Sequence, residues 1–240
     1  GTAEPDPRLP GLLNLLDVIQ WEVVVTLTNY GRVLEMASRP QRKIYAEAER
    51  LGRERLLRVA EEEATAGGDA TRVSRCIEKR LECLLLLGEL CRYRRRLGEA
   101  RRLITECLEL TARPEVRGNR NVASYVADAK ENLGNTLASM GRLEEAEATL
   151  REALALTVAQ DGPGSNQATQ GRACLATVLG RQRSAAKLQE AVVLAHSVAT
   201  DRRRVLGAED HKAIAAARYL ARLEAKACEV ALREGAMAML

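Results

Sequence analysis

Apolar residues recur every three or four positions along most of this chain of 240 residues, and that interval is the spacing of one face of an α-helix. Glycine, proline and arginine clusters separate the periodic stretches. The pattern predicts an all-α protein, with early helices at residues 11–37, 41–66, 70–93, 97–111, 121–139 and 143–159 and a last helix from about Asp210 to Glu234. Ser38-Arg39-Pro40 is expected to end the first of these helices, and Gly67-Gly68-Asp69 the second.

Two segments of this pattern repeat each other 46 residues apart. Gly88 aligns with Gly134, each after a leucine, and the matched positions that follow are Leu97 with Leu143, Ala100 with Ala146, Ile104 with Leu150, Cys107 with Ala153, and Leu110 with Leu156. Small residues at 134 and 146 would let two helices approach closely, while Leu150 fills the space beneath them. Such a unit buries its apolar face only against its neighbours, so the repeat predicts an α-solenoid.

The pattern extends unevenly beyond these two copies. Ala176 aligns with Gly134 at an offset of 42, but Leu188 aligns with Leu150 at an offset of 38, which predicts a turn about four residues shorter near residues 180–184. We expect a disordered lead at 1–10, an N-terminal helical hairpin at 11–69 that is a cap or a divergent repeat, and an array of about three repeats plus a C-terminal capping helix at 70–240.

The repeat resembles the tetratricopeptide repeat, on Leu133, Gly134, Leu137, Ala146, Leu150 and Ala153 in one copy and the aligned residues in the other. Its intervals exceed the usual length of about 34 residues and resemble those of kinesin light chains. The stretch from Arg202 to Lys212, with a Leu-Gly and a histidine, resembles the start of that family's helix A, although Lys212 stands where the family usually has proline. The resemblance covers about residues 70–225.

The resemblance implies that the first helix of each repeat lines a concave face that binds a partner peptide. The residues that it places there are Glu82, Leu85, Glu89, Arg92, Tyr93, Asp128, Glu131, Asn135, Gln170, Thr177, Arg181, Arg218, Arg222 and Lys226. Such a groove would run from acidic to basic and suit a segment with opposite charges at its ends. Family members often use an asparagine at the position of Asn135 to bind a peptide backbone, and the alternative is an exposed asparagine without a ligand.

Composition narrows the function classes. With 37 basic and 33 acidic residues the net charge is +4, which is too balanced to indicate nucleic acid by itself. The basic runs Arg92–Arg96 and Arg202–Arg204 would contact RNA or acidic lipid, or, as we favour, form a solvated turn and helix end. The apolar stretch Leu12–Leu27 contains charged residues and is too short to span a membrane, so no transmembrane segment is expected.

Six cysteines occur without a metal-ligand spacing, and we interpret them as small buried side chains in a reducing compartment, cytoplasmic or inside an organelle. No metal, cofactor or small-molecule substrate is expected. Cys174 and His196 form the one candidate pair for nucleophilic catalysis, but nothing in the sequence supplies an orienting third group. The chain is therefore predicted not to be an enzyme.

The favoured function is a scaffold that binds a protein partner through the concave face. One alternative is a structural subunit held permanently in a large multiprotein complex, including an organellar one. A less favoured alternative is an RNA-binding α-solenoid, whose affinity would fall steeply with salt.

Ala146→Arg tests the assigned repeat, because it forces a charge between two closely packed helices. We expect a loss of about 3 kcal/mol or more in the free energy of unfolding, or complete unfolding. Thermal unfolding followed by circular dichroism measures it, and an unchanged melting temperature would mean that the repeat is misplaced.

Overall fold

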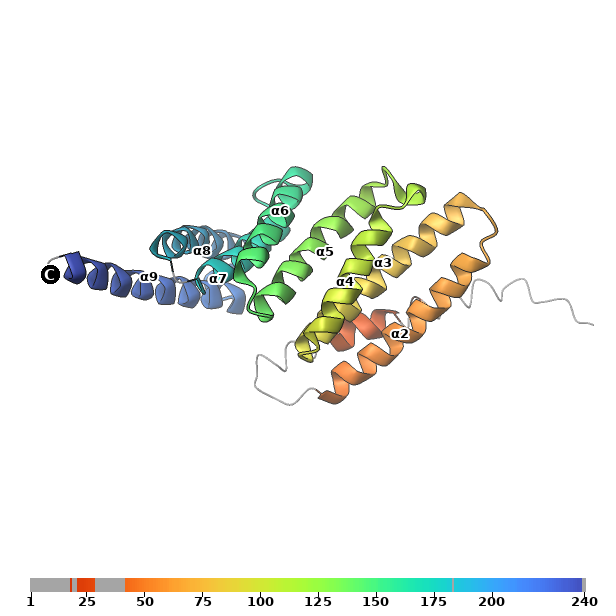
Figure 1. The fold of residues 1–240 in the computed structure, drawn as a ribbon, viewed down its shortest axis with the longest axis horizontal. Coiled ribbons are helices and arrows are strands. Elements are labelled where there is room, and N and C mark those ends of the chain that lie inside the picture. Colours follow the sequence, from red (N-terminus) through yellow and green to blue (C-terminus); the bar gives the residue numbers. More distant parts are fainter. Residues whose placement is uncertain (1–17, 19–20, 29–41, 183, 239–240) are drawn as a thin grey trace, which may run out of the picture. The chain divides into compact units, whose positions relative to one another are not determined.

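The computed structural model describes residue 18 and residues 21–28, 42–182 and 184–238, which are helical apart from short connections. Figure 1 shows the helices α2 (Arg42–Ala64), α3 (Ala70–Tyr93), α4 (Leu97–Thr111), α5 (Arg120–Ser139), α6 (Leu143–Asp161), α7 (Asn166–Leu179), α8 (Ala185–Leu206) and α9 (His211–Ala238). A short 3₁₀ helix at Pro114–Val116 precedes α5. No strand occurs among the described residues, so the all-α prediction is confirmed, and the bounds of α3 and α4 coincide with the predicted ranges.

Several predictions for the N-terminal region lie outside the described residues. They are the disordered lead at residues 1–10, the break at Ser38-Arg39-Pro40, and most of the helix at 11–37, of which residue 18 and residues 21–28 are described and helical. Val24 in that segment is buried against Tyr45, Ala48 and Leu90. The described segment 21–28 therefore packs on α2 and α3.

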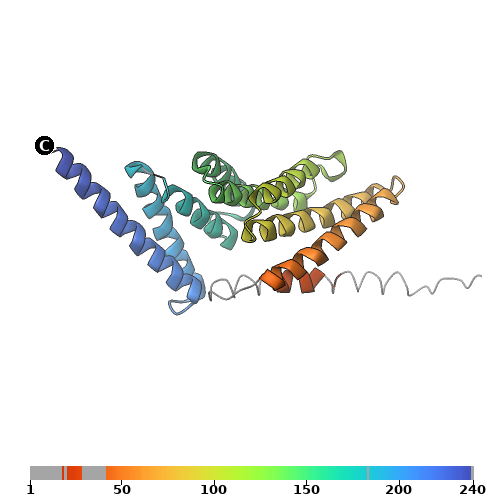
Figure 2. The ribbon, with the colours of Figure 1, turned by 60° about the horizontal axis from the view of Figure 1, so that its bottom comes forward.

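The contacts divide the chain into two compact units, residues 1–125 and 126–240, and α5 begins in the first and ends in the second. In the first unit α2, α3 and α4 lie side by side (Figure 1) around fully buried side chains such as Leu81, Leu87 and Ile104. In the second unit α6 to α9 pack in sequence, and α8 and α9 lie side by side (Figure 2). No described helix is long and apolar enough to cross a membrane.

The two helices of each repeat approach closely at the predicted glycines. A Cβ atom added to Gly134 would lie 2.6 Å from Leu150 Cγ and 3.3 Å from the Ala146 carbonyl oxygen. A Cβ atom on Gly88 would lie 2.7 Å from Ile104 Cγ1. The two distances between carbon atoms are shorter than a van der Waals contact. The predicted contact between a glycine and the aligned branched residue is therefore confirmed in both copies.

The turns that follow α3 and α5 share one geometry. The Arg96 amide donates to the Cys91 carbonyl at 2.8 Å, and the Arg142 amide donates to the Leu137 carbonyl at 3.0 Å. Each turn has one residue in the left-handed region, which is Gly141 at φ 85° in one and Arg95 at φ 63° in the other. A left-handed residue with a Cβ atom has a strained backbone. The turn of the first copy therefore carries this strain at Arg95, whereas Gly141 adopts the same conformation without it.

The third turn corrects a prediction. The stretch between α7 and α8 covers residues 180–184, whereas residues 140–142 separate α5 from α6, so this turn is longer and not shorter. The four-residue difference in offset arises at the start of the following helix instead. Leu188 is three residues into α8, whereas the aligned Leu150 is seven residues into α6. Leu188 still joins the core of the second unit at 2% exposure.

A buried glutamate joins α6 to the next helix pair. Glu147, 8% exposed, accepts hydrogen bonds from Gln182 Nε2 at 2.6 Å, from Arg151 at 2.8 Å and from the Lys187 ammonium. Arg151 extends the contact to Glu190 of α8 at 2.7 Å. Burial alone would raise the pKa of Glu147, but these donors outweigh it and lower the pKa to about 2.

The first unit has the same arrangement. Glu49 on α2 is 6% exposed and pairs with Arg53 four residues later. It also pairs with Arg94 and Arg96 in the turn between α3 and α4. Arg53 in turn pairs with Glu99 of α4. In both units a Glu-x-x-x-Arg pair on one helix thus holds the next helix pair by charge-assisted hydrogen bonds.

Alanine substitutions at two glycines are expected to change stability in opposite directions. Gly134→Ala should lower the free energy of unfolding by about 1–3 kcal/mol, because the added methyl group overlaps Leu150. Gly98→Ala, in α4 with open space around its Cα, should raise it by about 0.5–1 kcal/mol through helix propensity. Urea unfolding of both variants measures this, and equal effects would contradict the close approach.

Glu147→Gln tests the buried ion cluster. The lowered pKa of Glu147 means that its stabilisation is present above its ordinary pKa of 4.5 and is lost as the pH falls towards 2. We expect the variant to lose about 1–3 kcal/mol at pH 7, and its deficit relative to wild type to shrink below pH 4.5. Glu145→Gln, which affects a half-exposed pair with Arg142, is the control and should cost less than about 1 kcal/mol.

Candidate functional site

Four polar side chains from α5 and α7 meet in the second unit. Asn135 Nδ2 and Gln170 Nε2 each lie 3.5 Å from the Cys174 sulfur, and that thiol donates to Glu131 Oε1 at 3.6 Å. Two members, four residues apart, come from each helix, so they share one face of it. We call Glu131, Asn135, Gln170 and Cys174 the α5–α7 cluster, and the first three are among the residues predicted for one binding face.

The local sequence lets the two helices meet at this cluster. A Cβ atom on Gly171 would lie 3.2 Å from Leu154 Cδ1 and at the ordinary contact distance of 3.7 Å from Glu131 Oε2, so the glycine beside Gln170 leaves room for the Leu154 side chain of α6. From α8, Arg202 donates to Gln170 Oε1 at 3.0 Å. The cluster is therefore fixed from three helices.

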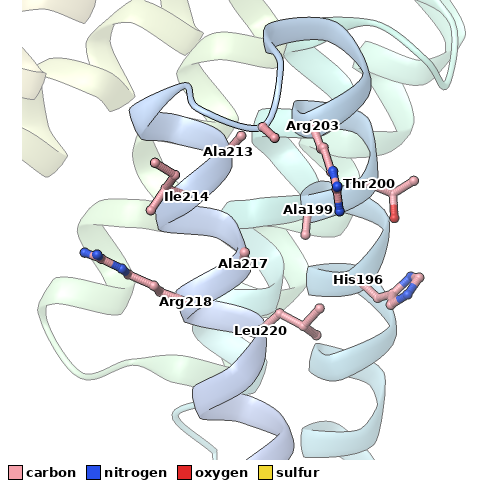
Figure 3. A pocket seen from close by; sticks show the side chains of 10 residues that line it. His196, Ala199, Thr200, Arg203, Ala213, Ile214, Ala217, Arg218 and Leu220 are labelled. Carbon is pink, nitrogen blue, oxygen red and sulfur yellow. The ribbon is translucent and has the colours of Figure 1, made fainter.

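Cys174 is a neutral thiol and not a nucleophile. Burial, and after it the neighbouring Glu131 carboxylate, raises the pKa of Cys174 to about 12. His196, its proposed partner, is exposed on α8 and lines a separate pocket of about 510 Å³ between α8 and α9, where its ring projects from α8 (Figure 3). The structure does not bring the two groups together, so the candidate for nucleophilic catalysis lacks both a thiolate and a base.

Charged residues flank the α5–α7 cluster with opposite signs. Asp128 lies exposed on α5, and partial desolvation by the surrounding protein, followed by Asp161, raises the pKa of its carboxyl. Thr177 and Arg181 are exposed on α7 and just beyond its end.

On α9, Arg218, Arg222 and Lys226 are exposed at intervals of four residues. Arg222 stacks on the Tyr219 ring at 5.6 Å, and Lys226 donates to the Gly180 carbonyl at 2.7 Å. Within the second unit, the charge of the predicted face thus changes from acidic on α5 to basic on α9.

The residues predicted on α3 are engaged in contacts within the first unit. Leu85 is 9% exposed, so its prediction as a binding residue is wrong and it is part of the core. Tyr93 stacks on Tyr45 of α2 with ring centroids 5.6 Å apart and donates to Glu89 at 3.0 Å. The packing of α2 on this part of α3 was missed, because nothing in the sequence of the N-terminal hairpin shows which face of α3 it would cover.

The other two predicted α3 residues also have partners. Arg92 lies over the Tyr93 ring at 4.5 Å and 3.9 Å from Glu89. Glu82 accepts a hydrogen bond from the Tyr125 hydroxyl at 2.9 Å. The polar α3 residues are consequently engaged in contacts within the first unit and do not present a row of available groups.

The basic runs are largely used inside the protein. Arg94 and Arg96 pair with the buried Glu49, which corrects the expectation of a solvated turn. In the second run, Arg202 contacts Gln170 and Arg204 pairs with Asp201 at 3.2 Å. These contacts give arginines of both runs a structural role, which weakens the hypothesis of RNA binding.

One group of possible metal ligands occurs among the described residues, formed by Glu49, Cys91 and Glu99 with ligand atoms within 4.8 Å of one another. Arg53, Arg94 and Arg96 already neutralise the two carboxylates. Burial raises the pKa of the Cys91 thiol to about 11, so it does not supply a thiolate. This group does not suit a cation.

Comparison with known proteins supports the repeat. Residues 126–159, which hold most of α5 and most of α6, match the model of the tetratricopeptide repeat family. The crystal structure of a putative kinesin light chain from Podospora anserina, with nearly identical tetratricopeptide-like repeats, is similar at 18% identity and a TM-score of 0.55, over 89% of this chain and 93% of that one. No curated protein matches the sequence.

The crystal structure of BtubC (BKLC) from P. vanneervenii is also similar, at 16% identity and a TM-score of 0.49 over 88% and 91% of the two chains. The matched repeat coincides with the pair of helices in which Gly134 contacts Leu150. Residues 126–159 therefore form a tetratricopeptide repeat, and the chain has an α-solenoid fold.

Proposed function

We propose that the chain is a non-catalytic scaffold that binds an extended segment of a partner protein across α5 and α7. The observation that carries this proposal is the meeting of Glu131, Asn135 and Gln170 around Cys174. A side-chain amide has both donors and an acceptor, so Asn135 and Gln170 together match the alternating N–H and C=O groups of a peptide backbone.

The present partners of the two amides are easily exchanged. Both donate to a thiol sulfur at 3.5 Å, and sulfur is a weak hydrogen-bond acceptor. A peptide carbonyl oxygen is a stronger one, so binding replaces weak bonds by better ones and leaves no donor unpaired. The cluster therefore favours a ligand that presents backbone groups.

The flanking charges give a direction to the partner. Asp128 on α5 favours a basic group at one end of the segment, while Arg218 and Arg222 on α9 favour acidic groups at the other. Complementary charges of this kind set orientation and association rate more than affinity. A structural subunit of a large complex would use the same groups with its partner held permanently.

Binding measurements on a partner identified by affinity purification and mass spectrometry test the proposal. Asn135→Ala combined with Gln170→Ala, and separately Asn135→Ala combined with Arg222→Glu, should each weaken binding by roughly tenfold or more in isothermal titration calorimetry. Gln160→Ala, an exposed glutamine on α6, is the matched control and should bind as wild type. Unchanged affinity in both double variants would remove this face from the function.

A further inference from the structure

One repeat position that is covered in the earlier repeats is open on α9. Ala221 aligns with Ala176 of α7 at an offset of 45, and Ala176 in turn aligns with Gly134 of α5. Ala176 is fully buried in the core that Leu188 of the following helix joins, and Gly134 contacts Leu150 of the following helix. Ala221 is exposed. The place that the second helix of a repeat takes is therefore open at α9 in the described chain.

α9 does not turn back where the other first helices of a repeat do. α5 ends five residues after Gly134 and α7 ends three residues after Ala176, and each is followed by the helix that covers it. α9 continues unbroken to Ala238, seventeen residues or about 26 Å beyond Ala221. The described chain thus lacks, at this position, the hairpin turn that covers the first helix in the other repeats.

The pocket between α8 and α9 lies on the same face of α9. It has a volume of about 510 Å³, and the apolar part of its lining consists of Ile214, Leu220 and four alanines from both helices and their connection (Figure 3). Ile214, Ala217 and Ala221 follow one another at intervals of three or four residues, so the pocket and the open position are continuous. We call this pocket together with Ala221 the end groove.

We propose that the end groove binds an amphipathic helix of a partner protein, antiparallel to α9, as α6 packs on α5. Grooves of this kind recognise a helix by apolar anchors at intervals of three and four residues. The repeat provides the pattern: a small residue, a branched aliphatic residue four positions later, and a small residue three positions after that. These residues are Ala100, Ile104 and Cys107 in α4, and Ala146, Leu150 and Ala153 in α6. In the bound helix the branched residue lies over Ala221.

Charge selects the direction of the bound helix. Arg203 and His196 of α8 line the pocket, and no acidic residue occurs among the described residues that line it. Ala208 and Ala213 line it too, so Arg203 lies beside the start of α9. A helix antiparallel to α9 ends there, and cations attract both the negative end of the helix dipole and acidic side chains in its last turn.

The end groove is separate from the α5–α7 cluster. None of the four residues of that cluster lines the pocket. Arg218, which we assign to the extended partner segment, contributes to the lining, but its side chain projects away from α8 (Figure 3). The charge argument for the bound helix therefore uses Arg203 and His196 and not Arg218.

A labelled peptide with the sequence of α6, Leu143–Asp161, is the probe. It carries the repeat pattern, and its five acidic residues outnumber its one arginine. Fluorescence anisotropy with the purified chain should show saturable binding with a dissociation constant on the order of 100 µM or tighter. The same peptide with Leu150→Ala should bind roughly tenfold more weakly or worse. Absence of saturable binding of the wild-type peptide up to about 500 µM chain would overturn the proposal.

Variants of the chain locate the binding site. Ala221→Leu puts a branched side chain where the leucine of the bound helix lies, so it should weaken peptide binding roughly tenfold or more. Ala215→Leu, at an exposed alanine on another face of α9, is the matched control and should bind as wild type. Asn135→Ala combined with Gln170→Ala should also leave peptide binding unchanged, so the end groove and the α5–α7 cluster are tested separately. Circular dichroism shows that the variants are folded.

Sedimentation velocity distinguishes a partner helix from a second copy of the chain. The wild-type chain alone at about 50 µM should be a monomer of 26.3 kDa. A dimer that Ala221→Leu dissociates would assign the end groove to a second copy and overturn the proposal. Peptide binding that Ala221→Leu leaves unchanged would overturn it as well, because the peptide then binds elsewhere.

Discussion

The close contact between a glycine on one helix and a branched side chain on the next is the constraint on which the rest of the structure depends. Gly134 leaves no room for a Cβ atom above Leu150, and Gly88 leaves none above Ile104. A bulkier residue at either position would push the two helices apart. Because α5 is held at this distance from α6, Glu131 and Asn135 are placed where α7 brings Gln170 and Cys174 to meet them.

Arginine and glutamate have a structural use that composition does not reveal. Glu49 and Glu147 are buried carboxylates, each held by an arginine four residues later and by donors from the next helix pair. A buried carboxylate without such partners would be costly. At the aligned positions of α4 the sequence has Arg101 and Thr105, so the Glu-x-x-x-Arg pair is a device of each unit and not of every repeat.

Local pattern predicted much of the fold. The bounds of α3 and α4 and the contact of Gly134 with Leu150 follow from periodicity and from the aligned copies, because both depend on residues close in sequence. The stacking of Tyr93 on Tyr45 and the burial of Leu85 did not follow, since they depend on which face of α3 the N-terminal hairpin covers. The ion clusters join residues 35 to 47 positions apart through long side chains, and no sequence period records such pairs.

The same distinction applies to the candidate site. The resemblance to the tetratricopeptide repeat predicted Glu131, Asn135 and Gln170 on one binding face, and helical spacing alone puts only Glu131 and Asn135 side by side. Sequence reasoning assigned Cys174 to a possible catalytic pair, whereas burial, followed by the Glu131 carboxylate, raises the pKa of that thiol. The α8–α9 pocket did not follow from the sequence, since it is defined by the space that the packed helices leave between them.

A double-mutant cycle between Gly134→Ala and Leu150→Ala tests the central constraint most directly. If the added methyl group overlaps Leu150, truncating that leucine removes the overlap and the methyl group fills part of the space left behind. We predict a favourable coupling of about 1 kcal/mol or more in the free energy of unfolding, so that the double variant is more stable than the sum of the single effects implies. Strictly additive effects would contradict it.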